Sequence, residues 1–297
     1  MIQAMAREAS EQVRRVVAGK EQVILWCLAA ILARGHILLE DIPGVGKTSL
    51  AVALAKVLGL ELGRVQFTCD VMPADVVGYS VLKNGEILHR PGPVQCNLFL
   101  ADELNRATSR TQSALLEAME EKQVTVDGVC YPLPEPFVVI ATQNPLGGAG
   151  TQPLPDSLQD RFFLRLQMGY PPKEEEKKMV LQCSTELQQI TTVQELLKMQ
   201  EVVADTYVKE TVAEYAVRLV SATRRSPLVV RGASPRATLS VVALSKAWAR
   251  IQGRDFVIPE DVREAFCGSL SHRILTRGNA QSCLHWIDRA VRPPKMK

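Results

Sequence analysis

The sequence predicts an α/β domain built on a mostly parallel five-stranded sheet, followed by a smaller α-helical domain. Short apolar strands alternate with helical segments over the first 170 residues, which is typical of parallel sheets with helices on both faces. The strand signals end near Tyr170-Pro171-Pro172, and only helical patterns follow. The chain before this point is slightly acidic, whereas the remainder is basic. We therefore expect a first domain over residues 1–172 and a second over residues 173–297.

The elements of the first domain follow in order along the chain. Two helices come first, then a buried strand, a glycine-rich turn at 41–48 and a further helix; the helices and strand span 2–17, 20–34, 35–40 and 48–58. Four more apolar runs predict strands at 64–68, 97–102, 136–142 and 162–166. The clearest later helix spans 109–121, where Ser109 and Gln112 have the spacing of a capping box.

Two hairpins interrupt the alternation of strands and helices. Asn84-Gly85 and Asp127-Gly128 supply the positive φ angles that a type I′ turn requires, and each lies between short strand-like runs. Both are predicted insertions into the α/β domain. The second domain is predicted to contain successive helices over 173–188, 193–204, 207–223, 234–251, 259–268 and 280–290.

The composition indicates a globular protein and narrows its function. The 297 residues are 46% hydrophobic and 23% charged, which excludes a disordered or fibrous chain. A net charge of +3 and an aromatic content of 5% disfavour a nucleic-acid partner. The seven cysteines include no CxxC pair, so we expect reduced thiols and a cytoplasmic location. The longest apolar run, Val23–Ala33, is shorter than the roughly 20 residues of a membrane helix, so no span is predicted.

The turn after the first strand has the sequence of a P-loop. Backbone N–H groups of such a loop, together with the following helix N-terminus, cradle a triphosphate. Lys47 is expected to neutralise the β- and γ-phosphate oxygens, and the Thr48 hydroxyl to bind Mg²⁺. Asp41 stands where the full pattern has glycine, and Asp tolerates left-handed φ better than most residues. The predicted ATP-binding residues are Pro43, Gly44, Val45, Gly46, Lys47, Thr48 and Ser49.

Two acidic residues and an amide follow later strands. The apolar strand 97–102 delivers Asp102 and Glu103 to its carboxyl end, where ligands bind in open α/β sheets. Asp102 is predicted to hold Mg²⁺ with Thr48, and Glu103 to act as the general base that polarises the attacking water. Asn144 follows the next strand and is expected to orient that water.

Two arginines are candidates for stabilising the transferred phosphoryl group. Arg161 precedes the fifth strand and is predicted to act in trans, as an arginine finger for the neighbouring subunit. Arg236 lies in the first turn of a helix of the second domain, where the helix dipole favours an anion as its neighbour.

The order of these motifs resembles AAA+ ATPases, and within them the MoxR family. The resemblance covers nearly the whole chain. It rests on GRVQFTCDVMPADVVGY (63–79), on the long segment 89–145 that includes NLFLADELNRATSRTQSALLEAMEEKQVTVDG, on LPDSLQDRF (154–162), and on GASPRA, GRDFVIPEDV and HRI in the second domain.

The resemblance implies properties that the composition alone does not. It implies a ring, usually hexameric, with ATP and Mg²⁺ between subunits, and hairpins that face the pore or the substrate. Because ring interfaces in this clade can use more than one arginine, the resemblance also makes Arg106 and Arg110 candidates for the interface. Val17 and Gly19 correspond to an adenine-contact segment, from which Lys20 departs where the family often has Gln. The implied activity is chaperone-like remodelling, assembly or activation of a client protein complex. A partner with a von Willebrand factor A domain would be a separate polypeptide.

Several other functions compete with this one. A nucleic-acid motor and a magnesium-chelatase-like ATPase subunit are the main alternatives. A small-molecule kinase is disfavoured by the arginine finger and helical lid. A scaffold without turnover is disfavoured because Glu103, Asn144 and Arg161 are all present.

Overall fold

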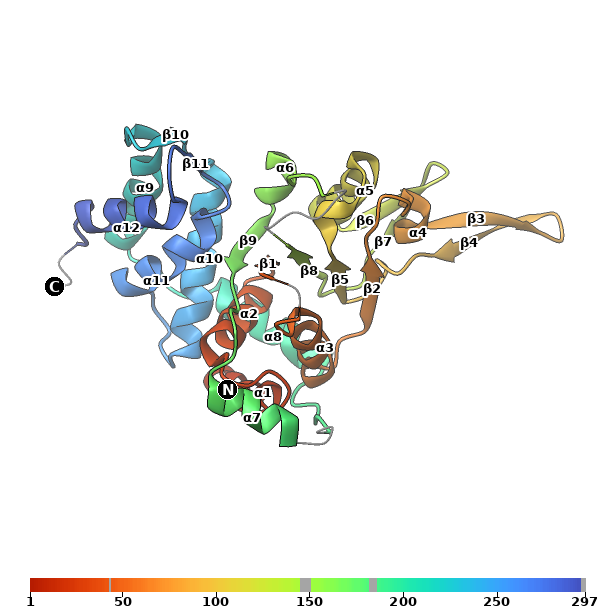
Figure 1. Cartoon of the computed structure of the whole chain (residues 1–297), viewed down its shortest axis with the longest axis horizontal. Helices are drawn as coiled ribbons and strands as arrows, with labels where there is room; N and C mark the ends of the chain where they lie inside the picture. The colour runs from red at the N-terminus through yellow and green to blue at the C-terminus, as the bar shows by residue number, and fades with distance from the viewer. Residues whose placement is uncertain (43, 145–150, 182–185, 295–297) are drawn as a thin grey trace.

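The computed structural model describes residues 1–42, 44–144, 151–181 and 186–294. A five-stranded sheet in the order β2–β5–β8–β1–β9 forms its centre (Figure 1). These strands span, in that order, Leu62–Gln66, Leu98–Asp102, Val138–Gln143, His36–Glu40 and Phe162–Leu166. Every pairing between them is parallel, which confirms the predicted sheet. All five strands therefore end at one edge, here called the carboxyl edge, and begin at the opposite amino edge.

Helices cover both faces of the sheet, as the alternation of elements predicted. One face is packed by helices from the start of the chain: α1 (Ile2–Arg14), α2 (Glu21–Leu32) and α3 (Lys47–Leu58). The other face is packed by α4 (Pro73–Val77), η1 (Leu104–Arg106), α5 (Ser109–Glu121) and α6 (Asp156–Gln159). Because successive side chains of a strand point to opposite faces, Leu38 and Leu39 enter different cores.

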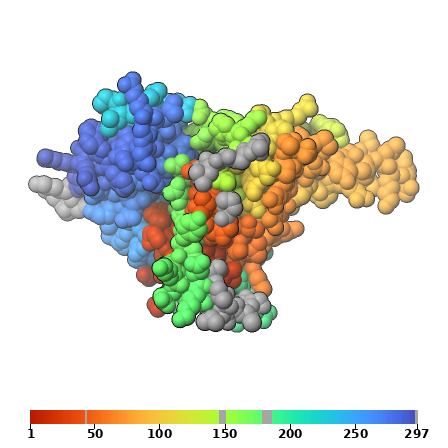
Figure 2. Space-filling model, in the orientation of Figure 1, coloured from red at the N-terminus to blue at the C-terminus, as the bar shows by residue number. Residues whose placement is uncertain are grey.

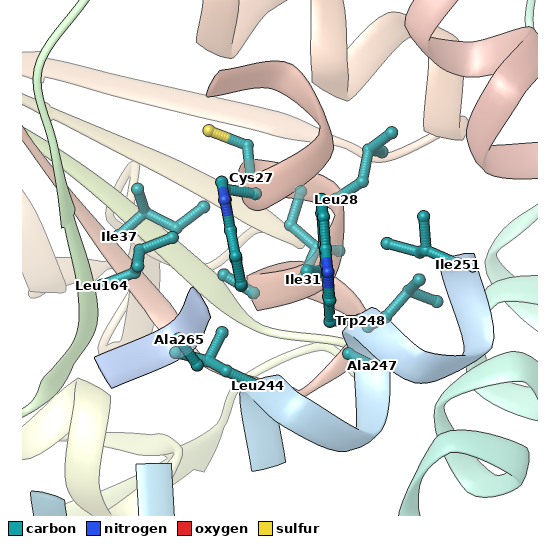
Figure 3. Packing of buried hydrophobic residues seen from close by; sticks show 14 of the residues in the cluster. Cys27, Leu28, Ile31, Ile37, Leu164, Leu244, Ala247, Trp248, Ile251 and Ala265 are labelled. Atoms are coloured by element: carbon teal, nitrogen blue, oxygen red, sulfur yellow. The ribbon is translucent and has the colours of Figure 1, made fainter. Parts of the chain in front are cut away.

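The second half of the chain packs on the face that α1–α3 cover. Its helices are α7 (Lys173–Leu181), α8 (Val193–Ala204), α9 (Glu210–Arg225), α10 (Pro235–Ile251), α11 (Pro259–Leu270) and α12 (Ala280–Ala290). Trp26 of α2 stacks on Trp248 of α10 with ring centroids 4.3 Å apart, in the core shown in Figure 3. One buried cluster thus joins the first helices to the later ones. The division at residues 172 and 173 stays a prediction.

Two antiparallel hairpins extend from the sheet-containing part. The first consists of β3 (Gly78–Lys83) and β4 (Glu86–Pro91), and it projects from the body of the molecule (Figure 2). The second consists of β6 (Gln123–Val126) and β7 (Val129–Pro132). Their turns have the positive φ angles expected: 54° and 82° at Asn84-Gly85, and 50° and 80° at Asp127-Gly128. The His89 and Tyr131 rings stack at 3.9 Å and connect the two hairpins.

Some local predictions were wrong. The cap of α5 is Thr108, whose Oγ1 accepts a hydrogen bond from the Thr111 N–H at 3.3 Å, so Ser109 is already helical. The Gln112 amide instead donates to the carbonyls of Leu104 and Ala107.

In the second half, the helix predicted over 173–188 ends at Leu181, and residues 182–185 lie outside the described part. Residues 186–192 are not helical: the Ile190 N–H bonds the Val57 carbonyl, which ties this connection to the end of α3. A small antiparallel pair, β10 (Val229–Arg231) and β11 (Leu275–Thr276), was not predicted, because strands this short carry no alternating pattern. Among the described residues, no helix is long and apolar enough to cross a membrane.

Candidate nucleotide-binding site

The glycine-rich loop joins β1 to α3 at the carboxyl edge. Gly44 and Gly46 have φ angles of 83° and 92°, a region that glycine adopts at little cost. A Cβ atom at Gly44 would have no neighbour within 4 Å, so the loop backbone faces open space. Lys47 begins α3, and its Nζ donates to the carbonyls of Asp41 and Ile42. Partial burial lowers the pKa of Lys47 below 10.5, an effect that the nearby carboxylates, Asp41 first among them, oppose.

Asp41 does not use the left-handed backbone that we considered for it. Asp41 is absent from the described residues with positive φ. Its contribution to the loop comes from hydrogen bonds to its side chain. The Asp41 carboxylate accepts hydrogen bonds from the backbone N–H groups of Ile42 and Gly169. A carboxylate at the loop entry thereby joins the P-loop to the chain that leaves β9, which glycine could not do.

Asp102 ends β5 beside the loop and is nearly buried. Its Oδ2 accepts hydrogen bonds from the Thr48 hydroxyl at 3.1 Å and from Arg64 Nη2 at 3.0 Å. Its Oδ1 accepts from the Thr142 hydroxyl at 2.6 Å. These bonds fix the carboxylate from both sides, because charged hydrogen bonds are short and directional. The hydroxyl and carboxylate of Thr48 and Asp102 form a pair of oxygen donors of the kind that Mg²⁺ prefers.

Glu103 follows with a strained backbone. Its φ is 56°, in the left-handed region that non-glycine residues seldom adopt and that is enriched at functional sites. The Glu103 N–H donates to Thr142 Oγ1 at 2.9 Å, so one hydroxyl holds both acidic residues. Its carboxylate accepts from Arg106 Nη1 at 2.8 Å. Arg106, considered above for the subunit interface, therefore lies beside the Glu103 of its own chain.

A cavity of about 380 Å³ brings most of the predicted nucleotide residues together. Its lining contains eight of them: Gly44, Gly46, Lys47, Thr48, Ser49, Asp102, Glu103 and Asn144. Three others do not line it: Val45 packs against the core, Val17 is buried in the core, and Gly19 lies against Pro172. Pro43 lies outside the described residues. The adenine contact of Val17 and Gly19 stays a prediction.

Arg161 and Arg236 lie away from this cavity. Arg161 immediately precedes β9, whose first residue pairs with His36 at the start of β1, so it lies at the amino edge. A five-residue strand is roughly 16 Å long, and this length separates Arg161 from the P-loop at the other edge. Both arginines bond Glu120 of α5. With Glu120 they line a second cavity, of about 260 Å³.

Comparison with known proteins identifies the family. The family described as "ATPase family associated with various cellular activities (AAA)" matches residues 36–164, and the "AAA lid domain" matches residues 221–284. Chaperone MoxR1 of Mycobacterium tuberculosis is 40% identical over 89% of this chain and 74% of its own length. The chain belongs to the MoxR family of AAA+ ATPases.

Two further comparisons cover almost the entire chain. YeaC of Bacillus subtilis is 43% identical over 92% of this chain and 88% of its own. A crystal structure from Cytophaga hutchinsonii, described as a "putative ATPase", superposes with a TM-score of 0.91 at 34% identity. It covers 99% of this chain and 96% of that one. The arrangement of sheet and helical lid is therefore that of a solved structure.

The lining of the first cavity contains residues that the motifs did not reveal. Arg64 on β2 and Thr142 on β8 both bond Asp102, and both line the cavity. An arginine inside a short strand and a threonine two residues before Asn144 were the available signals. Neither points to Asp102 until the strand order β2–β5–β8 is known.

Proposed function

We propose that this MoxR-family chain hydrolyses ATP at the interfaces of a homo-oligomeric ring, a hexamer, and uses that hydrolysis to remodel protein complexes. The observation that carries the proposal is the separation of two half-sites. Lys47, Thr48 and Glu103 line a cavity at the carboxyl edge of the sheet, whereas Arg161 and Arg236 lie at the amino edge. One chain therefore offers the nucleotide pocket at one edge and arginines at the other. A ring joins these half-sites between neighbours.

The cavity residues have complementary roles in this proposal. The loop backbone and Lys47 bind the phosphates, and Thr48 with Asp102 holds Mg²⁺, which would neutralise charge on the phosphate oxygens. Glu103 accepts the proton of the attacking water, and Asn144 orients that water. The Thr142 hydroxyl holds Asp102 and Glu103 in place by hydrogen-bonding the Asp102 carboxylate and the Glu103 N–H.

The arginines complete the site from the neighbouring subunit. In this arrangement Arg161 is a finger in trans, and Arg236 also acts in trans because it shares Glu120 with Arg161. Arginines supplied from outside a phosphoryl-transfer pocket contribute roughly 10³–10⁵ in rate. Hydrolysis then requires contact between subunits, which links ATP turnover to the shape of the ring.

The projecting hairpin β3–β4 is the proposed contact with a protein client. Leu82 and Ile87 near its turn are each 76% exposed, so the hairpin presents apolar side chains to solvent. Exposed apolar groups of this kind mark interaction sites for proteins. A separate polypeptide with a von Willebrand factor A domain is the proposed adaptor for the client.

Mixed rings test the proposed arrangement. Arg161→Ala subunits retain their own pocket, and Lys47→Ala subunits retain their own arginine. Each variant alone is expected to lose hydrolysis, whereas rings that contain both should regain part of it at the interfaces where intact halves meet. Co-assembly is verified by mass measurement. Absence of recovery in verified mixed rings would refute action in trans.

A second experiment separates a protein remodeller from a nucleic-acid motor. ATPase activity is measured with DNA and, in parallel, with proteins captured by the Glu103→Gln variant, which is expected to bind ATP without hydrolysing it. Stimulation by a captured protein and not by DNA supports the proposal. Stimulation by DNA alone would contradict it.

A further inference from the structure

Glu120 lies between Arg161 and Arg236 and contacts both. It lies near the end of α5, at the amino edge of the sheet, where the carbonyl of Met119 is hydrogen-bonded to His36 at the start of β1. One carboxylate oxygen of Glu120 accepts a hydrogen bond from Arg161 Nη2. The other accepts from Arg236 Nη2 at 3.4 Å. A single carboxylate thus bridges residues that are separated by the whole connection from β9 to α10.

The backbones that carry these arginines are also joined. The Ser234 hydroxyl caps α10, two residues before Arg236, and it lies 2.9 Å from each carboxylate oxygen of Asp160, the residue before Arg161. Arg273 is buried and donates to the Asp160 carbonyl at 2.8 Å. The Asp160–Ser234 contact therefore joins the backbone segments that carry the two arginines, while Glu120 holds their guanidinium groups.

We propose that Glu120 is a positioning residue that holds Arg161 and Arg236 as a convergent pair for the neighbour's phosphates. This inference rests on the proposed function, because it assigns Glu120 to the half-site that the arginines form. Two guanidinium groups repel each other, and a carboxylate between them offsets that repulsion. Without Glu120 the two cations separate, and the geometry that stabilises the developing charge is lost.

The Glu120→Gln variant tests this role with little change in shape. Its amide oxygen can accept from one arginine, but its NH₂ group is a donor and cannot serve the other. We expect kcat for ATP hydrolysis to fall about tenfold or more, as for displaced positioning groups, with KM and ATP affinity within about twofold of wild type. Glu121→Gln, one residue along the same helix, is the matched control and should retain wild-type kcat. Glu120→Asp keeps the charge but is one methylene shorter, and an intermediate kcat is expected.

Mixed rings show whether Glu120 acts with the arginine half-site or with the nucleotide pocket. Glu120→Gln mixed with Lys47→Ala should regain hydrolysis, because the Lys47→Ala subunit contributes an intact arginine half-site. Glu120→Gln mixed with Arg161→Ala should gain none, because both subunits are defective in the same half. Recovery in the second mixture would overturn the proposal, since it would place Glu120 with the nucleotide pocket. So would a kcat within about twofold of wild type in assembled Glu120→Gln rings.

The outcome for Glu120 is separable from the outcome for the proposed function. If wild-type rings hydrolyse ATP and the Arg161→Ala and Lys47→Ala mixture recovers, the proposed function stands whatever Glu120→Gln does. Thermal unfolding of each variant verifies the fold. A Glu120→Gln chain that does not fold, together with Glu120→Asp at wild-type kcat, would also overturn a positioning role.

Discussion

The Thr142 hydroxyl is a single small group that contacts both acidic residues of the candidate site, Asp102 and Glu103. It is fully buried in β8, donates to Asp102 Oδ1 at 2.6 Å and accepts from the Glu103 N–H at 2.9 Å. Thr142→Val replaces this hydroxyl with a methyl group of nearly the same size, and valine suits a strand. The substitution therefore creates no cavity and removes only the two hydrogen bonds.

The expected cost follows from these two bonds. A hydrogen bond to a charged group contributes about 1.5–3 kcal/mol, and a buried N–H left without a partner costs about 1–3 kcal/mol. Arg64 and Thr48 still bond Oδ2 of Asp102, so the Arg64 cation continues to offset the carboxylate charge. We expect Thr142→Val to lower the free energy of unfolding by about 3–5 kcal/mol, with a loss of ATPase activity.

Urea denaturation measures the change, and Thr142→Ser is the matched control. Serine keeps the hydroxyl and loses only one buried methyl group, which costs about 1 kcal/mol. The midpoint should therefore fall much further for Thr142→Val than for Thr142→Ser, at an unchanged slope with urea concentration. A valine variant as stable as the serine variant would refute the assignment of the hydroxyl as the link between Asp102 and Glu103.

Three further predictions concern single residues. Glu103→Gln should bind ATP in calorimetry yet hydrolyse it about 10²-fold or more slowly, and near-normal turnover would leave Glu103 without the role of base. Burial lowers the pKa of His36 from 6.5 to about 4, so the folded state favours the neutral imidazole. The free energy of unfolding should therefore be highest above pH 6.5 and fall by about 3 kcal/mol as the pH falls to 4. A His36→Gln variant with the same pH dependence in urea unfolding would contradict this. A Cβ at Gly63 would lie 1.9 Å from the Pro93 carbonyl oxygen, so Gly63→Ala should destabilise by about 2 kcal/mol or more in thermal unfolding, whereas Gly278→Ala, with open space around it, should change little.

Much of the fold could be predicted because its signals are local. An apolar run, a glycine-rich turn and an Asn-Gly pair each lie within a few consecutive residues, and each limits the backbone directly. The strand 162–166 was predicted with its observed bounds, and the turn at Asn84-Gly85 has the φ angles that its residues favour. The misplaced cap of α5 shows the limit: Thr108 and Ser109 are both good caps by residue type, and only the structure shows that Thr108 is the extended cap residue.

The position of Arg161 shows what strand direction adds. In a parallel sheet a residue before a strand lies at the edge opposite to a residue after one, so Arg161 and Lys47 had to be separated. That separation follows from the sequence once the strands are known to be parallel. Nothing comparable was available for Arg236, whose helix has no fixed relation to the sheet in the sequence.

The sequence by itself determined which groups we predict to carry the chemistry: the P-loop, Asp102 with Glu103, and the arginines at 161 and 236. The tertiary structure alone decided which groups hold them. Asp102 is hydrogen-bonded by Arg64 and Thr142, which lie 38 and 40 residues away in the sequence. Glu120 is hydrogen-bonded by Arg161 and Arg236, which lie 41 and 116 residues away. The physical reason is that a hydrogen bond requires its donor and acceptor atoms to lie within about 3.5 Å of each other, in a favourable direction. Only the packing of whole strands and helices fixes distant side chains to that precision.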